Sequence, residues 1–194
     1  MSEIRAFIAI ELPEAIHKAL EELSHKLQLE ITSGVRWVAT ENQHLTLKFL
    51  GESAPSKLQL LSRSLPAALR TQAPVTFSVG GLGAFPSLRR PRVLWVGIQA
   101  GPELAELHKA VESAAVGLGY AVEDKAFSPH LTLGRAQQHL PPRQIEQIAD
   151  GLSRVSAQRL GSLTADSVCL FKSDLKPEGP IYTPLARFKV GNAG

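Results

Sequence analysis

The sequence predicts an α+β fold built from antiparallel sheets, and two observations lead to this class. Strand-like apolar segments and amphipathic helical segments are mixed along all 194 residues. Residues 35–51 and 75–99 each hold two strand-like segments joined by a turn. Parallel strands need a long crossover, usually a helix, so these hairpin-like neighbours favour antiparallel pairing over the rival class, a doubly wound parallel sheet. No linker, low-complexity stretch or charge run divides the chain, so residues 1–194 are expected to form one domain.

Four segments have the apolar spacing of amphipathic helices. The first opens with Pro13, a residue suited to the first helical turn, and repeats apolar residues every three or four positions. Pro66 is expected to shorten or kink the second helix. Gly119 ends the third, as glycine often does. The four predicted helices span residues 13–31, 56–70, 101–119 and 142–155.

Short runs rich in β-branched and aromatic residues predict the strands. Polar or basic turns separate neighbouring runs, as in the segment PSLRRPR at residues 86–92. Two or three strands are expected to fill the chain after residue 155. The strands predicted with bounds are residues 4–12, 35–39, 44–51, 75–85, 92–99, 130–135, 167–173 and 182–190.

The composition is that of a globular protein able to bury a core. Hydrophobic residues make up 44% and charged residues 20% of the chain, and the net charge of +3 permits an anionic partner without requiring one. The single cysteine, Cys169, excludes an internal disulfide framework and a cysteine-based metal cluster, and it suits a reducing compartment. The N-terminal segment lacks the unbroken apolar core of a signal peptide, and no apolar run is long enough to span a membrane. A cytoplasmic, soluble protein is expected.

The tetrapeptide His-Leu-Thr-Leu occurs twice, at residues 44–47 and 130–133. Side chains alternate between the faces of a strand, so His44 and Thr46 share one face and the two leucines the other. The second copy repeats this arrangement. Because the leucines favour the core, each histidine and threonine should face water or a cleft. Two such strands brought together would line one groove with two imidazoles and two hydroxyls.

This set of side chains suits phosphodiester chemistry. Histidine exchanges protons near neutral pH, so one imidazole can take a proton from a nucleophile while the other gives one to a leaving oxygen. Threonine hydroxyls and nearby cations are natural donors to phosphate oxygens. The pattern therefore predicts opening or closing of a phosphodiester without a metal ion.

The histidines have other interpretations. Either motif taken alone is most simply a strand with one solvated face. A zinc ion shared by His44 and His130 has no supporting spacing and no obvious third ligand. The remaining four histidines are most simply solvated surface residues. A serine hydrolase lacks its Gly-x-Ser-x-Gly elbow, and the glycine-rich residues 80–85 lack the features of a phosphate-binding P-loop.

The chain resembles the 2H phosphoesterase superfamily, defined by two His-x-Thr/Ser-x motifs, and its RNA 2′,3′-cyclic phosphodiesterase (2′-5′ RNA ligase) branch in particular. The likeness extends from the two motifs to most of the chain. It is carried by RAFIAIELP, VRWVATENQHLTLKFLG, GLGAFPSLRRPRVLWVGI, FSPHLTLGR and SDLKPEGPIYTPLARF, in that order. The resemblance implies a LigT-like fold of two pseudo-symmetric lobes around a central cleft, each lobe supplying one motif.

The resemblance also implies a reaction: hydrolysis of RNA 2′,3′-cyclic phosphate ends to 2′-phosphomonoesters, without metal or other cofactor, and its reversal as ATP-independent 2′-5′ joining. His44 would be the proton donor to the leaving 3′ oxygen and His130 the proton acceptor that activates water. Thr46 and Thr132 would bind the phosphate. The expected partner is RNA bearing such an end, with no membrane. No oligomerisation signal is present, so a monomer is expected.

Further substrate contacts are predicted beside the motifs. Lys48, Arg92 and Arg135 each lie on or beside a strand expected to line the cleft and are candidate phosphate or RNA-backbone contacts, with a solvated charge as the alternative for each. Arg135 has the opposite strand parity from His130, so it can reach the cleft only if the strand ends or bulges near Gly134. Phe85 is a candidate base-stacking residue. Trp37 is another candidate, but its apolar strand favours a core position.

Two functions from different classes remain on sequence grounds. The first is the metal-independent cyclic phosphodiesterase. The second is a non-catalytic RNA or nucleotide-binding module that uses the same cleft. The enzyme is favoured, because a binding module would be served better by arginines than by paired histidines.

Overall fold

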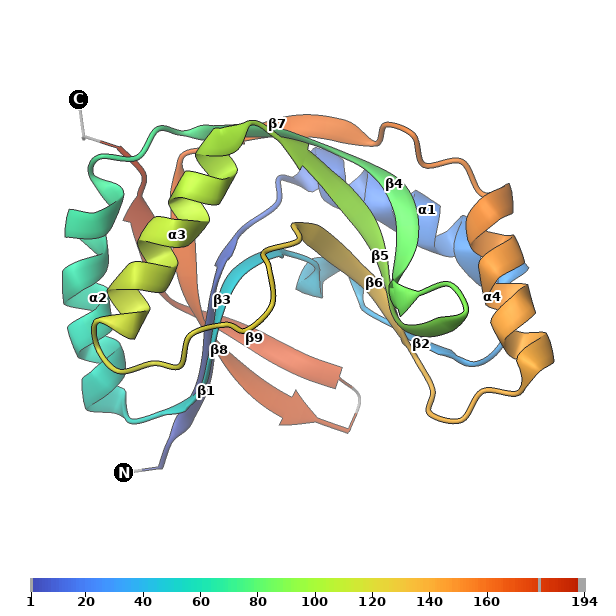
Figure 1. Cartoon of the computed structure of the whole chain (residues 1–194), viewed down its shortest axis with the longest axis horizontal. Coiled ribbons are helices and arrows are strands. Elements are labelled where there is room, and N and C mark those ends of the chain that lie inside the picture. The colour runs from blue at the N-terminus through green and yellow to red at the C-terminus, as the bar shows by residue number, and fades with distance from the viewer. Residues whose placement is uncertain (1, 178, 192–194) are drawn as a thin grey trace.

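The computed structural model describes residues 2–177 and 179–191, and it contains two antiparallel sheets and four α-helices (Figure 1). The first half of the chain forms β1 (Ile4–Ile10), α1 (Glu14–Glu30), β2 (Val35–Trp37), the 3₁₀ turn η1 (Thr40–Asn42), β3 (Leu45–Ser53), α2 (Pro55–Leu69) and β4 (Val75–Ser87). The second half forms β5 (Arg90–Ala100), α3 (Pro102–Val116), β6 (His130–Ala136), α4 (Pro142–Arg154), β7 (Gly161–Ala165), β8 (Ser167–Lys176) and β9 (Gly179–Lys189). The predicted α+β class is confirmed.

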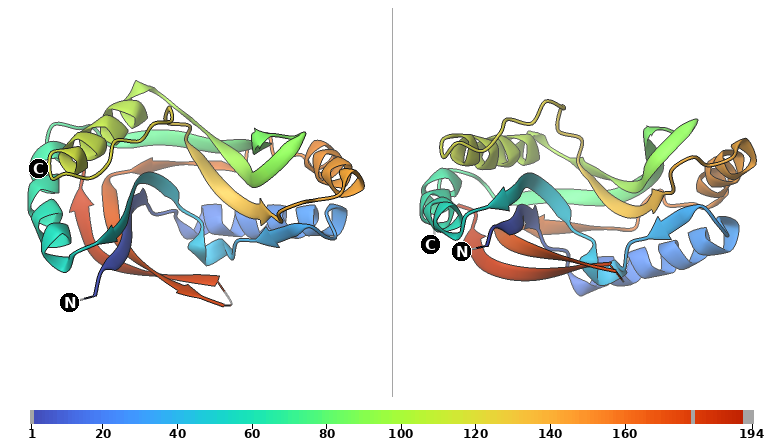
Figure 2. Two further views of the ribbon diagram at one scale, coloured as in Figure 1. Left: turned by 60° about the horizontal axis from the view of Figure 1, so that its bottom comes forward. Right: turned by 90° about the horizontal axis from the view of Figure 1, so that it is seen from below.

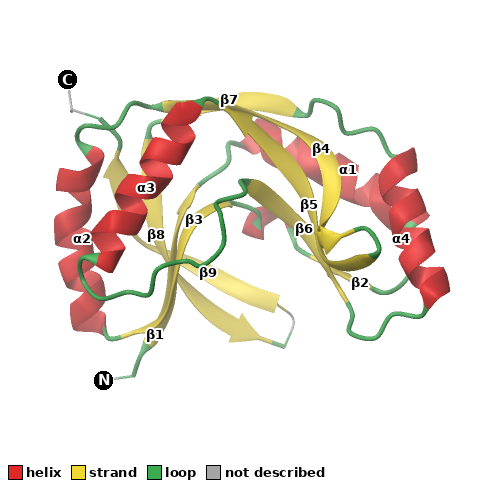
Figure 3. Cartoon of the chain, viewed as in Figure 1, coloured by secondary structure: helices red, strands yellow, loops and turns green. Residues whose placement is uncertain are grey.

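The sheets form two halves, each covered on its outer side by two helices (Figures 1 and 3). One sheet has four strands in the order β3-β1-β8-β9, and the helix pair α2 and α3 packs against it. The other has five strands in the order β2-β6-β5-β4-β7, with α1 and α4 beside it. Figure 2 shows the same separation from two further directions. Since α1 follows β1 in sequence but packs against the other sheet, the chain crosses early between the halves and ties them together.

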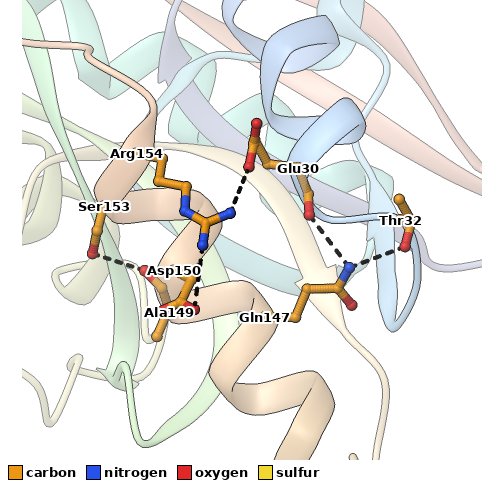
Figure 4. Close-up of polar contacts among 7 residues, drawn as sticks. All are labelled: Glu30, Thr32, Gln147, Ala149, Asp150, Ser153 and Arg154. Atoms are coloured by element: carbon orange, nitrogen blue, oxygen red, sulfur yellow. Dashed lines mark hydrogen bonds and ion pairs between the residues drawn. The ribbon is translucent and has the colours of Figure 1, made fainter.

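Polar contacts fasten α4 to the end of α1 (Figure 4). The Gln147 side chain donates to the Glu30 carbonyl and to the Thr32 hydroxyl, at 3.3 and 3.0 Å. Arg154 lies 3.4 Å from the Glu30 carboxylate and 3.9 Å from Asp150 one turn earlier. These pairs are largely exposed, so each contributes little energy, and the apolar faces of the two helices supply most of the packing.

The predicted helices and strands are present within a few residues of the expected bounds. Pro66 does not end α2, which continues through it to Leu69. The unassigned strand after residue 155 is β7, which adds to the edge of the five-stranded sheet. The predicted β4–β5 hairpin is confirmed.

The hairpin expected within residues 35–51 is wrong. β2 pairs with β6 and β3 pairs with β1, so these neighbours in sequence belong to different sheets. The η1 turn between them carries the chain from one sheet to the other, and it does so directly before His44. Local sequence shows that a turn separates two strands, but it does not show which strand each will pair with.

Candidate active site

A cavity of about 510 Å³ lies between the two sheets and is lined by residues of both. The four-stranded sheet contributes Thr46 and Phe49 from β3, and Tyr182 from β9. The five-stranded sheet contributes Thr132 and Arg135 from β6. His44, in the residue position just before β3, also lines the cavity. The cavity therefore brings His44 and Thr46 of the first motif together with Thr132 of the second, whereas His130 is not among the residues that line it.

His44 is held in an aromatic stack at the start of β3. Its ring lies over Phe7, with centroids 4.6 Å apart, and meets the Tyr182 ring edge-on at 5.2 Å. Phe7 in turn stacks on Phe171, at 5.2 Å. Burial among these rings lowers the pKa of His44 from 6.5 to about 4, and the hydrogen bond to the Asn42 carbonyl opposes this shift only in part.

His130, the first residue of β6, is placed in a related way. The Phe85 ring meets its imidazole edge-on, with centroids 4.9 Å apart. Burial lowers the pKa of His130 below its usual value, the Ser128 carbonyl opposes this shift, and the positive charge of Arg135 adds to it. Both imidazoles are therefore held neutral near pH 7 in the ligand-free protein.

The two histidines share one hydrogen-bond arrangement. Nδ1 of His44 lies 2.9 Å from the Asn42 carbonyl, and Nδ1 of His130 lies 2.7 Å from the Ser128 carbonyl, two residues earlier in each case. A carbonyl oxygen can only accept, so Nδ1 carries the proton on both rings. Nε2 is then the nitrogen that exchanges a proton, as a general acid or base requires.

Both motif strands also carry a β-bulge at the same place. Thr46 pairs with Ala9 and Lys48 with Ile8, so Leu47 is an extra residue in β3. Thr132 pairs with Trp95 and Gly134 with Leu94, so Leu133 is the extra residue in β6. Each bulge reverses the parity of the residues that follow it. We call His44 with Thr46, and His130 with Thr132, the two half-sites.

The bulges decide which residues reach the cavity. Arg135 lines it, as the sequence prediction allowed only if the strand bulged near Gly134. At the matching position in β3 stands Phe49, whose side chain is 60% exposed and also lines the cavity. Without the bulge, Phe49 would have pointed into the core and Lys48 into the cavity.

Lys48 is accordingly not brought to the site. Its side chain is only 1% exposed, and its ammonium donates to the Glu112 carboxylate at 2.9 Å and to the Ala121 carbonyl at 2.7 Å. In an unbroken strand, Lys48 would lie on the same face as Thr46, two residues earlier. The bulge at Leu47 turns it to the other face.

The other predicted contacts differ in their positions. Phe85 does not line the cavity and packs instead on His130 and on Trp95, the latter at 5.2 Å. Arg92 is exposed and does not line the cavity. Trp37 lies partly against the hydrophobic core, as its strand suggested, and partly on the cavity wall.

The cavity is electropositive. Arg5, Arg36 and Arg135 line it, and none of the three pairs with a carboxylate among the described residues. Of the described residues that line it, none is acidic. Arg36 and Arg135 lie opposite each other in the β2–β6 register. Because guanidinium groups bind phosphate oxygens in pairs of hydrogen bonds, this cavity suits an anionic substrate.

Sequence reasoning missed Arg5, Arg36, Phe49 and Tyr182. Arg135 was expected to reach the cavity only if its strand ended or bulged after the motif. The same condition, applied to the first motif, would have indicated Phe49. The other three come from strands distant in sequence, and only the pairing of β1, β2 and β9 places them beside the motifs.

Within residues 2–177 and 179–191, no three metal-ligating side chains of the His, Cys, Asp or Glu type are grouped as a metal site. Among the helices in these same ranges, none has the length and apolar character needed to cross a membrane.

The pattern of the LigT like phosphoesterases matches the chain twice, over residues 10–95 and 96–182. Each match contains one half-site. The chain belongs to the LigT like phosphoesterase family. The double match agrees with the two equivalent bulged strands and explains why the tetrapeptide occurs twice.

Curated relatives in this family span the whole chain. A protein of Methanothermobacter thermautotrophicus named RNA 2′,3′-cyclic phosphodiesterase is 31% identical, over 97% of this chain and 100% of its own length. A protein of Archaeoglobus fulgidus with the same name is 34% identical, over 96% and 100%.

Solved structures share the fold. The protein TT0787 of Thermus thermophilus superposes with a TM-score of 0.80 at 29% identity, covering 97% of this chain and 100% of its own. E. coli LigT complexed with 3′-AMP gives a TM-score of 0.76 at 27% identity, covering 98% and 99%. The predicted LigT-like architecture of two lobes is confirmed.

Proposed function

We propose that this protein hydrolyses the 2′,3′-cyclic phosphate at the end of an RNA chain to a 2′-phosphomonoester. The observation that carries the proposal is the pair of equivalent half-sites, one on each sheet, with His44, Thr46 and Thr132 on the wall of one electropositive cavity. The names of the curated relatives support this substrate, and the E. coli LigT complex shows that a family member binds a nucleotide, 3′-AMP.

The proposed reaction is an in-line displacement at phosphorus. Nε2 of His130 takes a proton from water as the water oxygen forms its bond to phosphorus. The bond from phosphorus to the 3′ oxygen breaks, and Nε2 of His44 gives that oxygen a proton. The product carries a 2′-phosphate and a free 3′-hydroxyl. Thr46, Thr132 and Arg135 donate hydrogen bonds to the phosphate oxygens as charge develops on them.

The low pKa of His44 is compatible with a proton donor. In the free protein the imidazole is neutral near pH 7, because it is buried among aromatic rings. A bound cyclic phosphate brings a negative charge into the cavity, and a nearby opposite charge raises the pKa of an imidazole. The substrate itself therefore favours the protonated form of His44 that the reaction consumes.

The same residues serve the joining of RNA ends. The 5′-hydroxyl of another RNA takes the place of water, and its oxygen attacks the cyclic phosphate, so that a 2′-5′ bond forms without ATP. When that bond is cleaved again, microscopic reversibility exchanges the roles of the two histidines, and the acid becomes the base. No second subunit is needed, because both half-sites come from one chain.

The test is an assay with a synthetic RNA that ends in a 2′,3′-cyclic phosphate. We expect a 2′-phosphate product, and we expect EDTA to leave the rate unchanged because the proposed chemistry uses no metal ion. A 3′-phosphate product would contradict the assigned leaving group, and loss of activity in EDTA would contradict the metal-free mechanism.

The second candidate function is a non-catalytic RNA-binding module that uses the same cavity. It is favoured by the three arginines on the cavity wall, which suffice for binding. This alternative predicts capture of the cyclic end with no product, and equal affinity when His44 and His130 are both changed to Asn.

A further inference from the structure

A buried ion pair stands behind the His44 half-site, on the face of β3 opposite the cavity. Lys48 follows the bulge at Leu47, and its Nζ lies 2.9 and 2.8 Å from the two carboxylate oxygens of Glu112 in α3. The same ammonium donates to the Ala121 carbonyl at 2.7 Å. Burying a charged pair gives little net stability compared with apolar packing, so its presence calls for a reason other than stability.

Lys48 and Glu112 are both hydrogen-bonded to the segment that leads to the other half-site. Residues 117–129 connect α3 to β6, and His130 is the first residue after them. Glu112 accepts a second hydrogen bond from the backbone N–H of Glu123, at 3.1 Å. The Glu123 side chain accepts one from the backbone N–H of Phe49, at 3.4 Å. Two consecutive residues of β3, Lys48 and Phe49, are thus bonded to this connection.

The far end of the connection is fixed to α3 as well. The His108 ring stacks on the Phe127 ring, with centroids 3.9 Å apart and planes within 12°. Phe127 precedes Ser128, whose carbonyl accepts the Nδ1–H of His130 at 2.7 Å. Contacts therefore hold both ends of this connection: β3 and Glu112 hold Ala121 and Glu123, and His108 holds Phe127, next to the carbonyl that orients His130.

The matching position in the second half-site has no such group. Gly134 occupies in β6 the register position that Lys48 occupies in β3. A methyl group there would lie 2.7 Å from Val35 and 3.2 Å from Trp37, so packing against β2 leaves no room for a side chain. The contacts made by Lys48 therefore have no counterpart at Gly134 in β6. They connect the His44 half-site to the segment before His130, and Gly134 has no side chain that could connect β6 to the segment before His44.

We propose that Lys48, paired with Glu112, is a positioning residue that fixes His130 relative to the His44 half-site. The ion pair holds residues 121–123 against β3, and this connection sets where β6 begins. Lys48 acts through the connection and touches no reacting atom. This inference rests on the proposed function for its kinetic consequence, while the structural consequence for His130 can be measured separately.

The first test is Lys48→Met, which keeps the length of the side chain and removes the ammonium. We expect kcat on the cyclic end to fall by ~10-fold or more with little change in KM, because a small misplacement of a catalytic group affects the transition state more than substrate binding. Lys57→Met is the matched control. Lys57 donates to the Gly119 carbonyl at 3.0 Å and lies over the Tyr120 ring, so it ties the start of the same connection to α2 and not to β3. We expect Lys57→Met to keep the wild-type kcat.

A double variant separates positioning from stability. Lys48→Met with Glu112→Met replaces the pair by apolar groups, which should restore most of the thermal midpoint lost in Lys48→Met. The Ala121 carbonyl and the Glu123 N–H still lack their partners, so we expect kcat to stay low. Recovery of kcat together with the midpoint would overturn the proposal, because it would show that Lys48 serves stability alone.

A spectroscopic measurement decides the matter independently of activity. In Lys48→Met we expect the imidazole Cε1–H resonance of His130 to shift or broaden, while Lys57→Met leaves it as in the wild type. An unchanged His130 resonance in Lys48→Met would overturn the proposal. If the wild type left cyclic phosphate ends intact, the proposed function would fail, and this comparison alone would still test the positioning role.

Discussion

The two half-sites share one backbone arrangement and differ in the side chains around it. In each, a histidine stands at or just before the start of a bulged strand, its Nδ1–H donates to the carbonyl two residues earlier, and a threonine follows two residues later. The partner strands are equivalent too, since β1 pairs with β3 as β5 pairs with β6. What the halves share is the backbone arrangement that binds Nδ1 of each imidazole to a carbonyl and places a threonine two residues later.

The surroundings of the two imidazoles differ. His44 lies flat on Phe7 with Tyr182 at its edge, and burial brings its pKa to about 4. His130 meets only the edge of Phe85 and has Arg135 nearby. The shared backbone therefore presents two imidazoles in different surroundings, both with a pKa below its usual value.

The residues after the bulges differ most. In β3 the bulge is followed by the buried Lys48 and the exposed Phe49, and in β6 by Gly134 and Arg135. At the second position after the bulge, β3 thus offers an aromatic ring to the cavity and β6 offers a cation. The two half-sites therefore have the same histidine and threonine, while the positions after each bulge carry different side chains.

The strongest test of this equivalence is to remove each imidazole in turn. His44→Ala and His130→Ala should each lower kcat on a cyclic RNA end by ~10²–10⁴, the usual contribution of general acid–base catalysis. The double variant should lose little more than either single variant, because the two groups act in one step. Steady-state kinetics measures this, with the exposed His25→Ala on α1 as the control. If one variant kept a near wild-type rate, the two half-sites would not be catalytic partners.

Much of this comparison could be predicted from the sequence. The repeated tetrapeptide indicated His44, Thr46, His130 and Thr132 as candidates, and strand parity predicted that all four would line one groove. Thr46, Thr132 and His44 line one cavity, whereas His130 is not among the residues that line it. Apolar spacing located the helices, because a helix face is a local property.

What could not be predicted depends on contacts between distant segments. The pairing of β2 with β6 overrode the expected hairpin, since sheet partners are chosen across the whole chain. The bulge in β3 turns Lys48 away from the cavity and into a buried ion pair. The carboxylate partner, Glu112, lies 64 residues away, so the residues around Lys48 could not indicate this pair. Parity arguments fail at bulges, and bulges are common beside active sites.

The unequal burial of the imidazoles predicts a difference in acid stability. A folded-state pKa of about 4 against 6.5 when unfolded means that the unfolded chain binds the His44 proton first as pH falls. Wild-type stability should therefore drop, relative to His44→Asn, by roughly 3 kcal/mol between pH 6.5 and pH 4, at about 1.4 kcal/mol per pKa unit. Denaturant unfolding at a series of pH values measures the difference, and subtraction of the variant removes the effect of the carboxylates.

The same experiment compares the halves. As pH falls, the free energy of unfolding of the wild type should also drop relative to His130→Asn, because burial also lowers the pKa of that imidazole. If the free energies of unfolding of wild type and His44→Asn differed by the same amount at every pH in this range, the buried, neutral imidazole would be contradicted.

The smallest expected effects concern Phe49 and Arg135, the matching positions after the bulges. Arg135→Gln should weaken binding of a cyclic RNA end by ~10-fold and reduce the slope of log affinity against log salt by about one, since one phosphate contact is lost. Phe49→Ala should weaken binding by about 1 kcal/mol, the lower end of the range for a base stacked on an aromatic side chain, and leave the salt slope unchanged, because stacking on a base involves no counterion.

Exposed residues of α2 serve as matched controls, Arg63→Gln for the cation and Leu60→Ala for the apolar side chain. Both should bind as the wild type does. A changed salt slope in Phe49→Ala, or an unchanged one in Arg135→Gln, would show that the two positions do not divide the substrate into a base and a phosphate. Agreement would instead mean that a single duplicated strand, bulged at the same residue, reads two chemically different parts of one nucleotide.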